Sequence, residues 1–238
     1  MAIWIPIPFL LFTVTALIIV DERALPGAGR NLRWVLVWKL LSTLLVILVA
    51  ALSFSRPGTH DLTYSLLILG GLGLSLAGDV LIIFPSSRAF MAGLVAFLCA
   101  HLAYIAAFIY LQTSRELGRN LPAELSAALV LALIAAVVYR FLLPGLGKMR
   151  IPVIAYMTVI TVMVHRALAV AFNYPGQPLL SILIVVGALL FYTSDALLAI
   201  NRFRMGDRMP HGRLWSLSTY YAGQLLLALS VTYATALM

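Results

Sequence analysis

Residues 75–84 read SLAGDVLIIF, a run of small and apolar side chains in which Asp79 is the only ionisable group. The run closes an apolar stretch that begins near Leu62. An ionised carboxylate at membrane depth costs at least about 2.5–3.5 kcal/mol, so such a residue marks a functional site by default. Residues 191–200, FYTSDALLAI, repeat the pattern, with Asp195 following a small residue near the end of a long apolar run. We therefore predict that the rest of the chain is a membrane-embedded scaffold that brings Asp79 and Asp195 together.

The composition excludes an ordinary globular enzyme. Of the 238 residues, 63% are hydrophobic and 10% are charged, whereas soluble domains carry about 25% charged residues. The net charge of +8 would suggest nucleic acid in a soluble protein. Here the basic residues fall mostly in loops, where they set topology and meet anionic lipid headgroups, so we expect membrane lipids and no nucleic acid as partners. The single cysteine, Cys99, allows no intramolecular disulfide.

The hydropathy pattern predicts an all-α integral membrane protein. A spanning helix needs roughly 20 apolar residues, and short loops rich in Pro and Gly leave no room for a soluble domain. We expect one transmembrane domain over residues 1–238, a bundle of about eight helices, with Pro122 and Pro178 in first turns, where no backbone donor is lost. The first span precedes any basic residue and is read as retained rather than as a cleaved signal. The predicted spans are 3–20, 33–54, 62–84, 89–111, 122–142, 151–172, 178–200 and 214–237.

The loop charges predict the orientation. The even-numbered loops carry three basic residues, Arg56, Arg115 and Arg119. The odd-numbered loops carry eleven: Arg23, Arg30, Arg33, Arg88, Arg140, Lys148, Arg150, Arg202, Arg204, Arg208 and Arg213. Positively charged loops stay in the cytoplasm, so both termini are expected on the non-cytoplasmic side.

With this orientation, several polar residues fall in one layer of the membrane. Asp79 and Asp195 each lie about five residues before the cytoplasmic end of a span, ~7–9 Å inside the apolar layer at 1.5 Å per residue. Other spans place polar residues at or just below this depth: Lys39, Tyr156, Tyr220, Gln224 and His101. Polar residues that were merely tolerated at unrelated positions would not readily fall at one depth.

Small residues predict close helix packing beside Asp79. Gly71, Ser75 and Gly78 follow i, i+4, i+7 spacing, a face that lets another helix approach closely. Asp79 and Asp195 are also 116 residues apart, on spans three and seven of eight. This spacing suggests a 4+4 parallel repeat, in which two units of four spans each have the same orientation in the membrane.

Each polar residue also has a structural interpretation. The two carboxyls could simply pair with Lys39 to stabilise the bundle, and Lys39 could instead extend to the interface or bind a phosphate. His101 could be a hydrogen-bonded structural residue. The pair His165-Arg166, far from the aspartate layer, is interpreted as structural or interfacial. The arginines of residues 202–213 are interpreted as topology determinants that could also attract a phosphate headgroup.

Matched depth favours a catalytic role for the two carboxyls. Two neighbouring carboxyls in a low dielectric cannot both ionise cheaply, so one can act as an acid while the other acts as a base. Several other chemistries are not supported. Four histidines and one cysteine without ligand spacing give no zinc site, and there is neither a GxSxG elbow nor a phosphate-binding loop. We expect no metal or cofactor.

In three segments, polar residues interrupt an otherwise generic apolar helix. The first is residues 78–81, GDVL, followed by Phe97, His101 and Tyr104. The second and most specific is residues 194–203, SDALLAINRF, and the third is residues 220–226, YYAGQLL. With these segments the chain resembles the YhhN family, which contains animal transmembrane lysoplasmalogenases and bacterial relatives. Gly223 stands where alanine is expected in many relatives.

The resemblance implies an intramembrane hydrolase that cleaves the vinyl ether bond of lysoplasmalogens to a fatty aldehyde and a glycerophospho-alcohol. It places the protein in a bacterial inner (cell) membrane. The resemblance and the polar layer together nominate Asp79 and Asp195 as catalytic residues. The expected substrate-binding residues are Lys39, Ser75, His101, Tyr104, Tyr156, Ser194, Asn201, Arg202, Tyr220 and Gln224. Substitution of either aspartate by asparagine is expected to abolish turnover without unfolding the bundle.

Three other functions fit parts of the pattern. Paired intramembrane carboxylates with a repeat would also suit a proton-coupled transporter or carrier, although no span has a proline at mid-membrane. An intramembrane aspartyl protease is a weaker alternative, because Asp195 lacks the preceding tyrosine of that group. A non-catalytic lipid-binding protein ranks last. Release of aldehyde from a lysoplasmalogen distinguishes the hydrolase from all three.

Overall fold

The computed structural model describes residues 2–22, 31–54 and 61–234. Within them the chain forms helices and no strands, which confirms the all-α prediction. The α-helices are α1 (Pro6–Glu22), α2 (Leu32–Phe54), α3 (Leu62–Ile83), α4 (Ser87–Ser114), α5 (Leu121–Leu146), α6 (Arg150–Asn173), α7 (Pro178–Ala199) and α8 (Gly212–Ser230). Short helical turns precede α1 (η1, Ala2–Trp4), join α5 to α6 (η2, Gly147–Met149) and extend α7 as a π-helix (η3, Ile200–Arg204).

Length and apolar composition identify a multi-pass membrane protein. Among the described residues, five segments are long and apolar enough to cross a bilayer: Leu32–Phe54, Leu62–Ile83, Ser87–Ser114, Leu121–Asn173 and Pro178–Arg204. The fourth of these contains both α5 and α6, while α1 is a shorter apolar helix. Large apolar side chains on α5, such as Leu125 and Val137, are more than 60% exposed, as expected for residues that face lipid. The count of eight spans, the repeat and the orientation stay predictions.

Local sequence signals explain where several helices begin. Asp61 accepts a hydrogen bond from the backbone N–H of Tyr64 (3.0 Å) and caps α3. Asn120 caps α5 in the same way through Ala123. Both satisfy a backbone donor that has no partner inside the helix. Pro122 and Pro178 lie in the first turns of α5 and α7, as predicted.

Three predicted span ends differ from the observed helix ends by four residues or more. The eighth span was expected to reach residue 237, but α8 ends at Ser230 and the chain turns over residues 231–233. The fifth span was expected to end at residue 142, before Pro144, but α5 continues through this proline to Leu146. A proline this close to the end disturbs only the last turn, and Gly147, with φ +48°, then redirects the chain. The seventh span was expected to end at residue 200, but the chain stays helical through η3 to Arg204.

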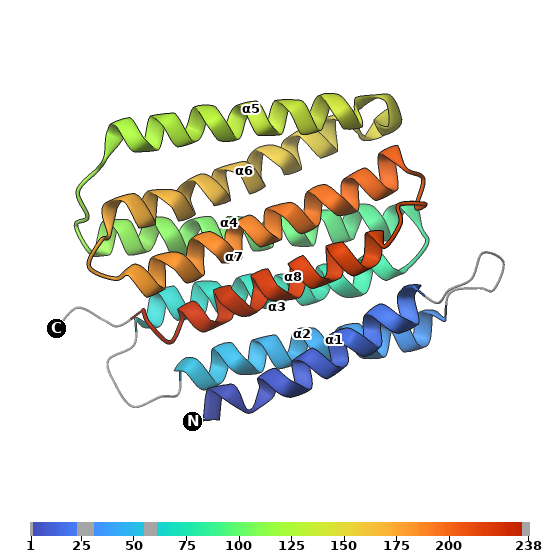
Figure 1. The fold of residues 1–238 in the computed structure, drawn as a ribbon, viewed down its shortest axis with the longest axis horizontal. Coiled ribbons are helices and arrows are strands. Elements are labelled where there is room, and N and C mark those ends of the chain that lie inside the picture. Colours follow the sequence, from blue (N-terminus) through green and yellow to red (C-terminus); the bar gives the residue numbers. More distant parts are fainter. Residues whose placement is uncertain (1, 23–30, 55–60, 235–238) are drawn as a thin grey trace.

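The helices pack side by side with their long axes roughly aligned (Figure 1). Helix α3 lies along α4, α7 lies along α8, and α2 contacts α1, α3 and α8. Helix α5 lies at the periphery, where it packs on α6 and, near its C-terminal end, on η3. This arrangement brings the C-terminal ends of α3 and α7 to the same end of the bundle as the N-terminal ends of α2, α4, α6 and α8.

Glycines permit the two tightest helix pairs. A Cβ atom on Gly71 would lie 2.3 Å from the Tyr104 ring and one on Gly78 would lie 2.7 Å from the Phe97 ring, both on α4. This confirms the close approach predicted from the small-residue face of α3. Between α7 and α8, a Cβ atom on Gly223 would lie 2.8 Å from the carbonyl oxygen of Gly187. Alanine at position 223 would therefore not fit this packing unchanged.

Some sequence-based predictions fall outside the described residues. They are the loop charges Arg23, Arg30 and Arg56, together with the last residues, 235–237, of the eighth predicted span.

Candidate active site

Asp79 and Asp195 line one cavity of about 470 Å³ at the shared end of the bundle. Asp79 lies one turn before the end of α3, and Asp195 lies one turn before the end of α7. The cavity reaches the end of the bundle, since exposed residues such as Pro85 and Asp207 contribute to its lining. The two aspartates, which the sequence predicts to lie together, thus face a common cavity.

Asp79 is surrounded by donors. Its Oδ1 lies 3.0 Å from Lys39 Nζ, and its Oδ2 accepts hydrogen bonds from the Thr43 hydroxyl (2.6 Å) and the Tyr220 hydroxyl (2.8 Å). The carboxylate is 1% exposed. The carboxyl thus has a cation on one oxygen and two hydroxyl donors on the other, all from neighbouring helices. Lys39 thus pairs with Asp79, and the alternative in which it extends to the interface does not apply.

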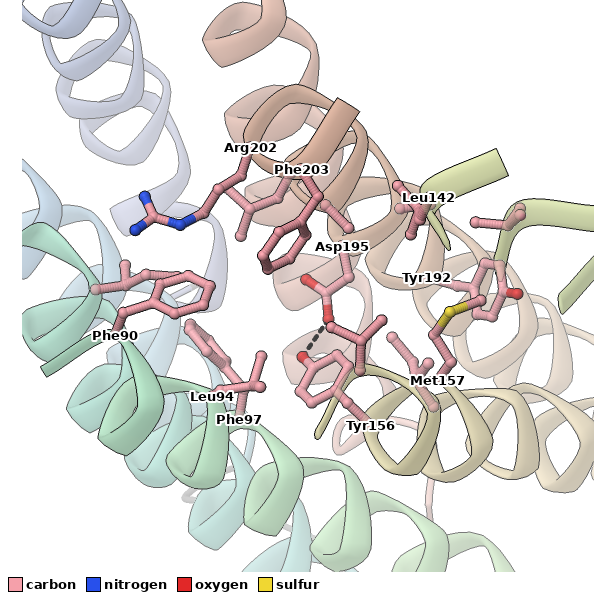
Figure 2. Close-up of a pocket in the computed structure, with 17 residues that line it drawn as sticks. Phe90, Leu94, Phe97, Leu142, Tyr156, Met157, Tyr192, Asp195, Arg202 and Phe203 are labelled. Atoms are coloured by element: carbon pink, nitrogen blue, oxygen red, sulfur yellow. Dashed lines mark hydrogen bonds between the residues drawn. The ribbon is translucent and has the colours of Figure 1, made fainter. Parts of the chain in front are cut away.

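Asp195 has different partners. Its Oδ2 accepts a hydrogen bond from the Tyr156 hydroxyl (Figure 2). The same oxygen lies 3.2 Å from His101 Nε2, and this nitrogen lies 2.9 Å from the Tyr156 hydroxyl. Among the described residues, no Lys or Arg pairs with Asp195, and its Oδ1 has no hydrogen-bond partner. One oxygen is therefore held in place, while the other is free to meet a ligand.

The geometry of His101 indicates its tautomer. The ring is fully buried, and its Nδ1 has no hydrogen-bond partner in the described part of the chain. A buried ring nitrogen without a partner is accommodated best as a bare lone pair, because an unpaired N–H would lose its hydrogen bond to water. The hydrogen therefore belongs on Nε2, where it can be donated to Asp195 or to the Tyr156 hydroxyl.

Aromatic rings separate the surroundings of the two aspartates. The Phe191 ring lies 5.3 Å from the Tyr220 ring and 4.7 Å from the His101 ring, in edge-on contacts. Phe97 contacts both Phe191 (6.4 Å) and Tyr220 (6.0 Å). The Phe97 and Phe191 rings thus pack between Tyr220, which donates to Asp79, and His101, which contacts Asp195. This packing holds both donors in position.

The predicted substrate-binding residues divide into three groups. Lys39, Ser194, Asn201, Arg202 and Tyr220 line the large cavity. Tyr156 lines a smaller neighbouring cavity. The remaining four line neither cavity and are buried beside the aspartates: Ser75, His101, Tyr104 and Gln224.

Several of these side chains have structural partners. Tyr104 donates to the side-chain oxygen of Gln224 (3.0 Å) and so joins α4 to α8. Ser194 donates to the backbone carbonyl of Ser216 (2.9 Å) and joins α7 to α8. Asn201 accepts from the backbone N–H of Met209 (3.0 Å) and holds the turn that follows η3. These hydrogen bonds hold the helices around the site in place. Ser194 and Asn201 also line the large cavity.

The arginines at this end of the bundle differ in their surroundings. Arg202 lines the large cavity and stacks on the Phe90 ring at 4.2 Å, with no carboxylate partner among the described residues. Arg204 lies over Phe141 of α5 at 5.3 Å, and neither Arg204 nor Arg88 lines the large cavity or its smaller neighbour. Arg202 is therefore the best-placed cation for an anionic group of a ligand.

Sequence reasoning missed two features of the site. Thr43, which donates to Asp79, follows Lys39 by one helical turn, and this i, i+4 spacing was an available signal. Arg213 and Asp21 form an ion pair at the cavity, and both line it. No local signal indicates this pair, because it depends on the packing of α1 against α8.

The opposite end of the bundle holds a separate charged cluster around Glu124, which is 2% exposed. Arg119 (2.7 Å) and Arg166 (3.4 Å) pair with its carboxylate, and Asn173 donates to it at 2.9 Å. The carboxylate raises the pKa of Arg119. His165 Nε2 lies 3.0 Å from the Glu124 backbone carbonyl. The cluster joins α5 to α6, so the structural interpretation of residues 165–166 is confirmed.

The described residues contain no group of three or more His, Cys, Asp and Glu side chains placed to hold a metal ion. The site's own residues offer two carboxyls with tyrosine, histidine and lysine partners.

Comparisons with known proteins agree with the resemblance noted in the sequence. The model of the YhhN family matches residues 34–231. Human lysoplasmalogenase TMEM86B is 34% identical over 167 residues, 70% of this chain and 64% of that protein. The mouse protein of the same name is 36% identical over 165 residues, 69% of this chain and 62% of that protein.

A bacterial relative extends the comparison. A lysoplasmalogenase of Mycobacterium tuberculosis (strain CDC 1551 / Oshkosh) is 30% identical over 186 residues, 77% of this chain and 66% of that protein. The chain thus spans a little under two thirds of the length of these relatives. No solved structure matches the chain.

Proposed function

The chain belongs to the YhhN family, and we propose that it is a lysoplasmalogenase-like hydrolase that uses Asp79 and Asp195 as an acid–base pair. The substrate would be a lysoplasmalogen, cleaved at its vinyl ether bond. Relatives that carry the name lysoplasmalogenase, one of them bacterial, support the activity. The observation that carries the mechanism is that two carboxyls with unlike partners line one cavity.

The partners of the two carboxyls support an assignment of roles. Asp79 forms an ion pair with the Lys39 ammonium, which lies 3.0 Å from its Oδ1. Asp195 faces the neutral donors Tyr156 and His101 on one oxygen only. We therefore assign the catalytic proton to Asp195 Oδ1 and the role of the base to Asp79.

The reaction begins with proton transfer to carbon. Asp195 gives its proton to the β-carbon of the vinyl ether, and the double-bond electrons form the new C–H bond. Positive charge develops on the α-carbon and the ether oxygen as an oxocarbenium ion. The Asp79 carboxylate stabilises this charge at low dielectric, where a fixed opposite charge is most effective. Glycosidases use two carboxyls against a related cation.

Water then completes the cleavage. It attacks the α-carbon while Asp79 takes one of its protons, and a hemiacetal results. Asp195, now a carboxylate, removes the hemiacetal hydroxyl proton as Asp79 returns its proton to the glycerol oxygen. The C–O bond to glycerol breaks, aldehyde and alcohol leave, and both carboxyls regain their starting states. The net reaction consumes one water molecule.

The remaining lining supports recognition of a lysophospholipid. Arg202 lies at the cavity without a carboxylate partner among the described residues, and its fixed planar guanidinium suits a phosphate. The carboxyls lie near the end of the bundle, about where the glycerol region of a lipid would meet the apolar layer. We expect the inner leaflet of a bacterial cell membrane to supply the substrate.

Incubation of the purified protein with 1-alkenyl lysophosphatidylcholine tests the proposal. Fatty aldehyde should appear in proportion to protein and time. The lysoacyl, alkyl-ether and diacyl analogues are the controls and should give none, since none of them has a protonatable vinyl ether carbon at a single chain. Absence of aldehyde from every vinyl ether would refute the proposal and favour a transporter or carrier.

A further inference from the structure

A second, apolar cavity lies beside Asp195 (Figure 2). Its volume is about 60 Å³, and its lining comes from α3, α4, α5, α6, α7 and η3. Side chains that line it and not the large cavity include Leu94, Leu142, Val153, Met157, Ala199 and Phe203. Apart from Tyr156, Tyr192, Asp195 and Arg202, every residue of the lining is apolar.

The two cavities share a wall that contains the catalytic carboxyl. Ile82, Phe90, Phe97, Asp195, Leu198 and Arg202 line both. On one side of this wall is the larger cavity with its charged lining, and on the other is the small apolar one. A molecule with a polar and an apolar half, joined at the reacting bond, would therefore have to lie across Asp195.

We propose that the small cavity, here called the chain slot, binds the first carbons of the substrate's hydrocarbon chain. This inference rests on the proposed function and adds the orientation of the substrate. The headgroup would lie in the large cavity near Arg202, the vinyl ether beside Asp195, and the chain in the slot.

The chemistry of the vinyl ether fits this orientation. Its β-carbon, which accepts the proton, carries the hydrocarbon chain, whereas its α-carbon carries the oxygen that leads to glycerol and phosphate. The acid must therefore reach the chain side of the double bond. Asp195 lines the chain slot, and Asp79 lines only the large cavity. The orientation thus agrees with the assignment of the acid.

The size of the slot defines what it holds. A water-sized group occupies about 10–15 Å³ on this measure of volume, so the slot has room for roughly 4–6 carbons of one chain. A chain that comes from the bilayer gains little free energy on entering, because lipid is as apolar as the slot. The slot therefore acts by position, and filling it should hinder long chains through overpacking.

A substitution that fills the slot tests the proposal. Ala199→Leu places a larger side chain in the slot from α7. We expect kcat/KM for a 16-carbon 1-alkenyl lysophosphatidylcholine to fall about tenfold, within the usual range for overpacking. The 1-butenyl analogue, whose chain ends two carbons beyond the double bond, should change by less than about twofold. Thr193→Leu is the control, since Thr193 is exposed on α7 and lines neither cavity. Equal losses for both substrates, or no loss for either, would overturn the proposal.

A second measurement needs no turnover. An alkyl-ether lysophosphatidylcholine with a diazirine on the fourth chain carbon should cross-link to slot residues such as Leu142 and Met157. Excess unlabelled lipid and the Ala199→Leu substitution should both reduce this labelling. Labelling confined to exposed residues of the same helices, such as Val137 and Ile154, would contradict the slot. If the slot is labelled but no vinyl ether releases aldehyde, the proposed function fails alone. If aldehyde forms and the label misses the slot, the chain-slot proposal fails alone.

Discussion

Replacement of Asp195 leaves no buried Lys or Arg unpaired, since its partners in the described residues are Tyr156 and His101. We predict that Asp195→Asn lowers aldehyde release by at least about 10²–10⁴-fold, because an amide can neither donate nor accept the catalytic proton. The melting temperature should stay within a few degrees of wild type. Aldehyde release and thermal unfolding of the same preparation measure both. A folded Asp195→Asn protein with full turnover would remove this residue from the mechanism.

Asp79 differs, because its ion pair with Lys39 leads us to predict that asparagine at this position also affects stability. Asp79→Asn leaves the mostly buried Lys39 ammonium without its carboxylate, and breaking one partner of a buried pair costs about 3–5 kcal/mol. We predict that Asp79→Asn lowers both turnover and melting temperature. The double substitution Lys39→Met/Asp79→Asn should recover the melting temperature and leave turnover lost. Recovery of both would mean that the pair is only structural.

Arg202 and Arg204 form a matched pair, because both stack on aromatic rings but only Arg202 lines the cavity. We predict that Arg202→Gln raises KM for lysophosphatidylcholine-type vinyl ethers about tenfold and changes kcat little, since a charged hydrogen bond contributes about 1.5–3 kcal/mol. Arg204→Gln should leave both constants near wild type. Steady-state kinetics on the two variants would reveal a similar rise in KM for both if the effect were only long-range charge.

At the scale of single residues, the sequence predicted which side chains form the site better than it predicted their hydrogen-bond partners. Depth along the helices was sufficient to group Lys39, Asp79, Asp195 and Tyr220, since polar residues at one depth on a bundle must meet inside it. Which donor pairs with which oxygen depends on the rotation of each helix about its axis. An apolar sequence constrains that rotation weakly, because lipid and protein are both apolar neighbours.

Among the elements, the contact between α5 and η3 depends on one glycine. A Cβ atom on Gly145 would lie 1.6 Å from the carbonyl oxygen of Phe203, so Gly145→Ala must displace η3 and with it Arg202 and the wall of the chain slot. We predict at least tenfold lower kcat/KM. Gly73→Ala is the control, since no atom lies within 4 Å of its added Cβ, and it should keep full activity. Equal activity of the two variants would show that the placement of η3 does not matter.

The same contact explains why α5 and the helix formed by α7 and η3 end later than predicted. Pro144-Gly145 is typical of a loop, and the polar residues after Ile200 are typical of a helix end. In the structure, the backbone at Gly145 packs directly against the backbone at Phe203 of η3. This contact stabilises the helical conformation of both segments. A contact between residues almost 60 positions apart leaves no local signal.

For the whole molecule, composition was sufficient to predict an all-α membrane protein. The charges of the loops predict its orientation in the membrane, which chemical labelling can test. In a Cys99→Ala background, we predict that Arg208→Cys, in the turn after η3, reacts with a membrane-impermeant maleimide only after cells are opened. Gly118→Cys, in the turn after α4, should react in intact cells. Both positions are exposed. The reverse pattern would place the site end of the bundle outside.

The central claim is that the paired carboxyls cleave a vinyl ether by protonating carbon, and the isotope content of the product tests it most directly. Wild-type protein would be incubated with 1-alkenyl lysophosphatidylcholine in D₂O, with the aldehyde reduced at once to the alcohol and analysed by mass spectrometry. Protonation of the β-carbon from an exchangeable carboxyl predicts one deuterium on the carbon next to the former aldehyde carbon. A product without deuterium at that carbon would contradict acid attack on the double bond.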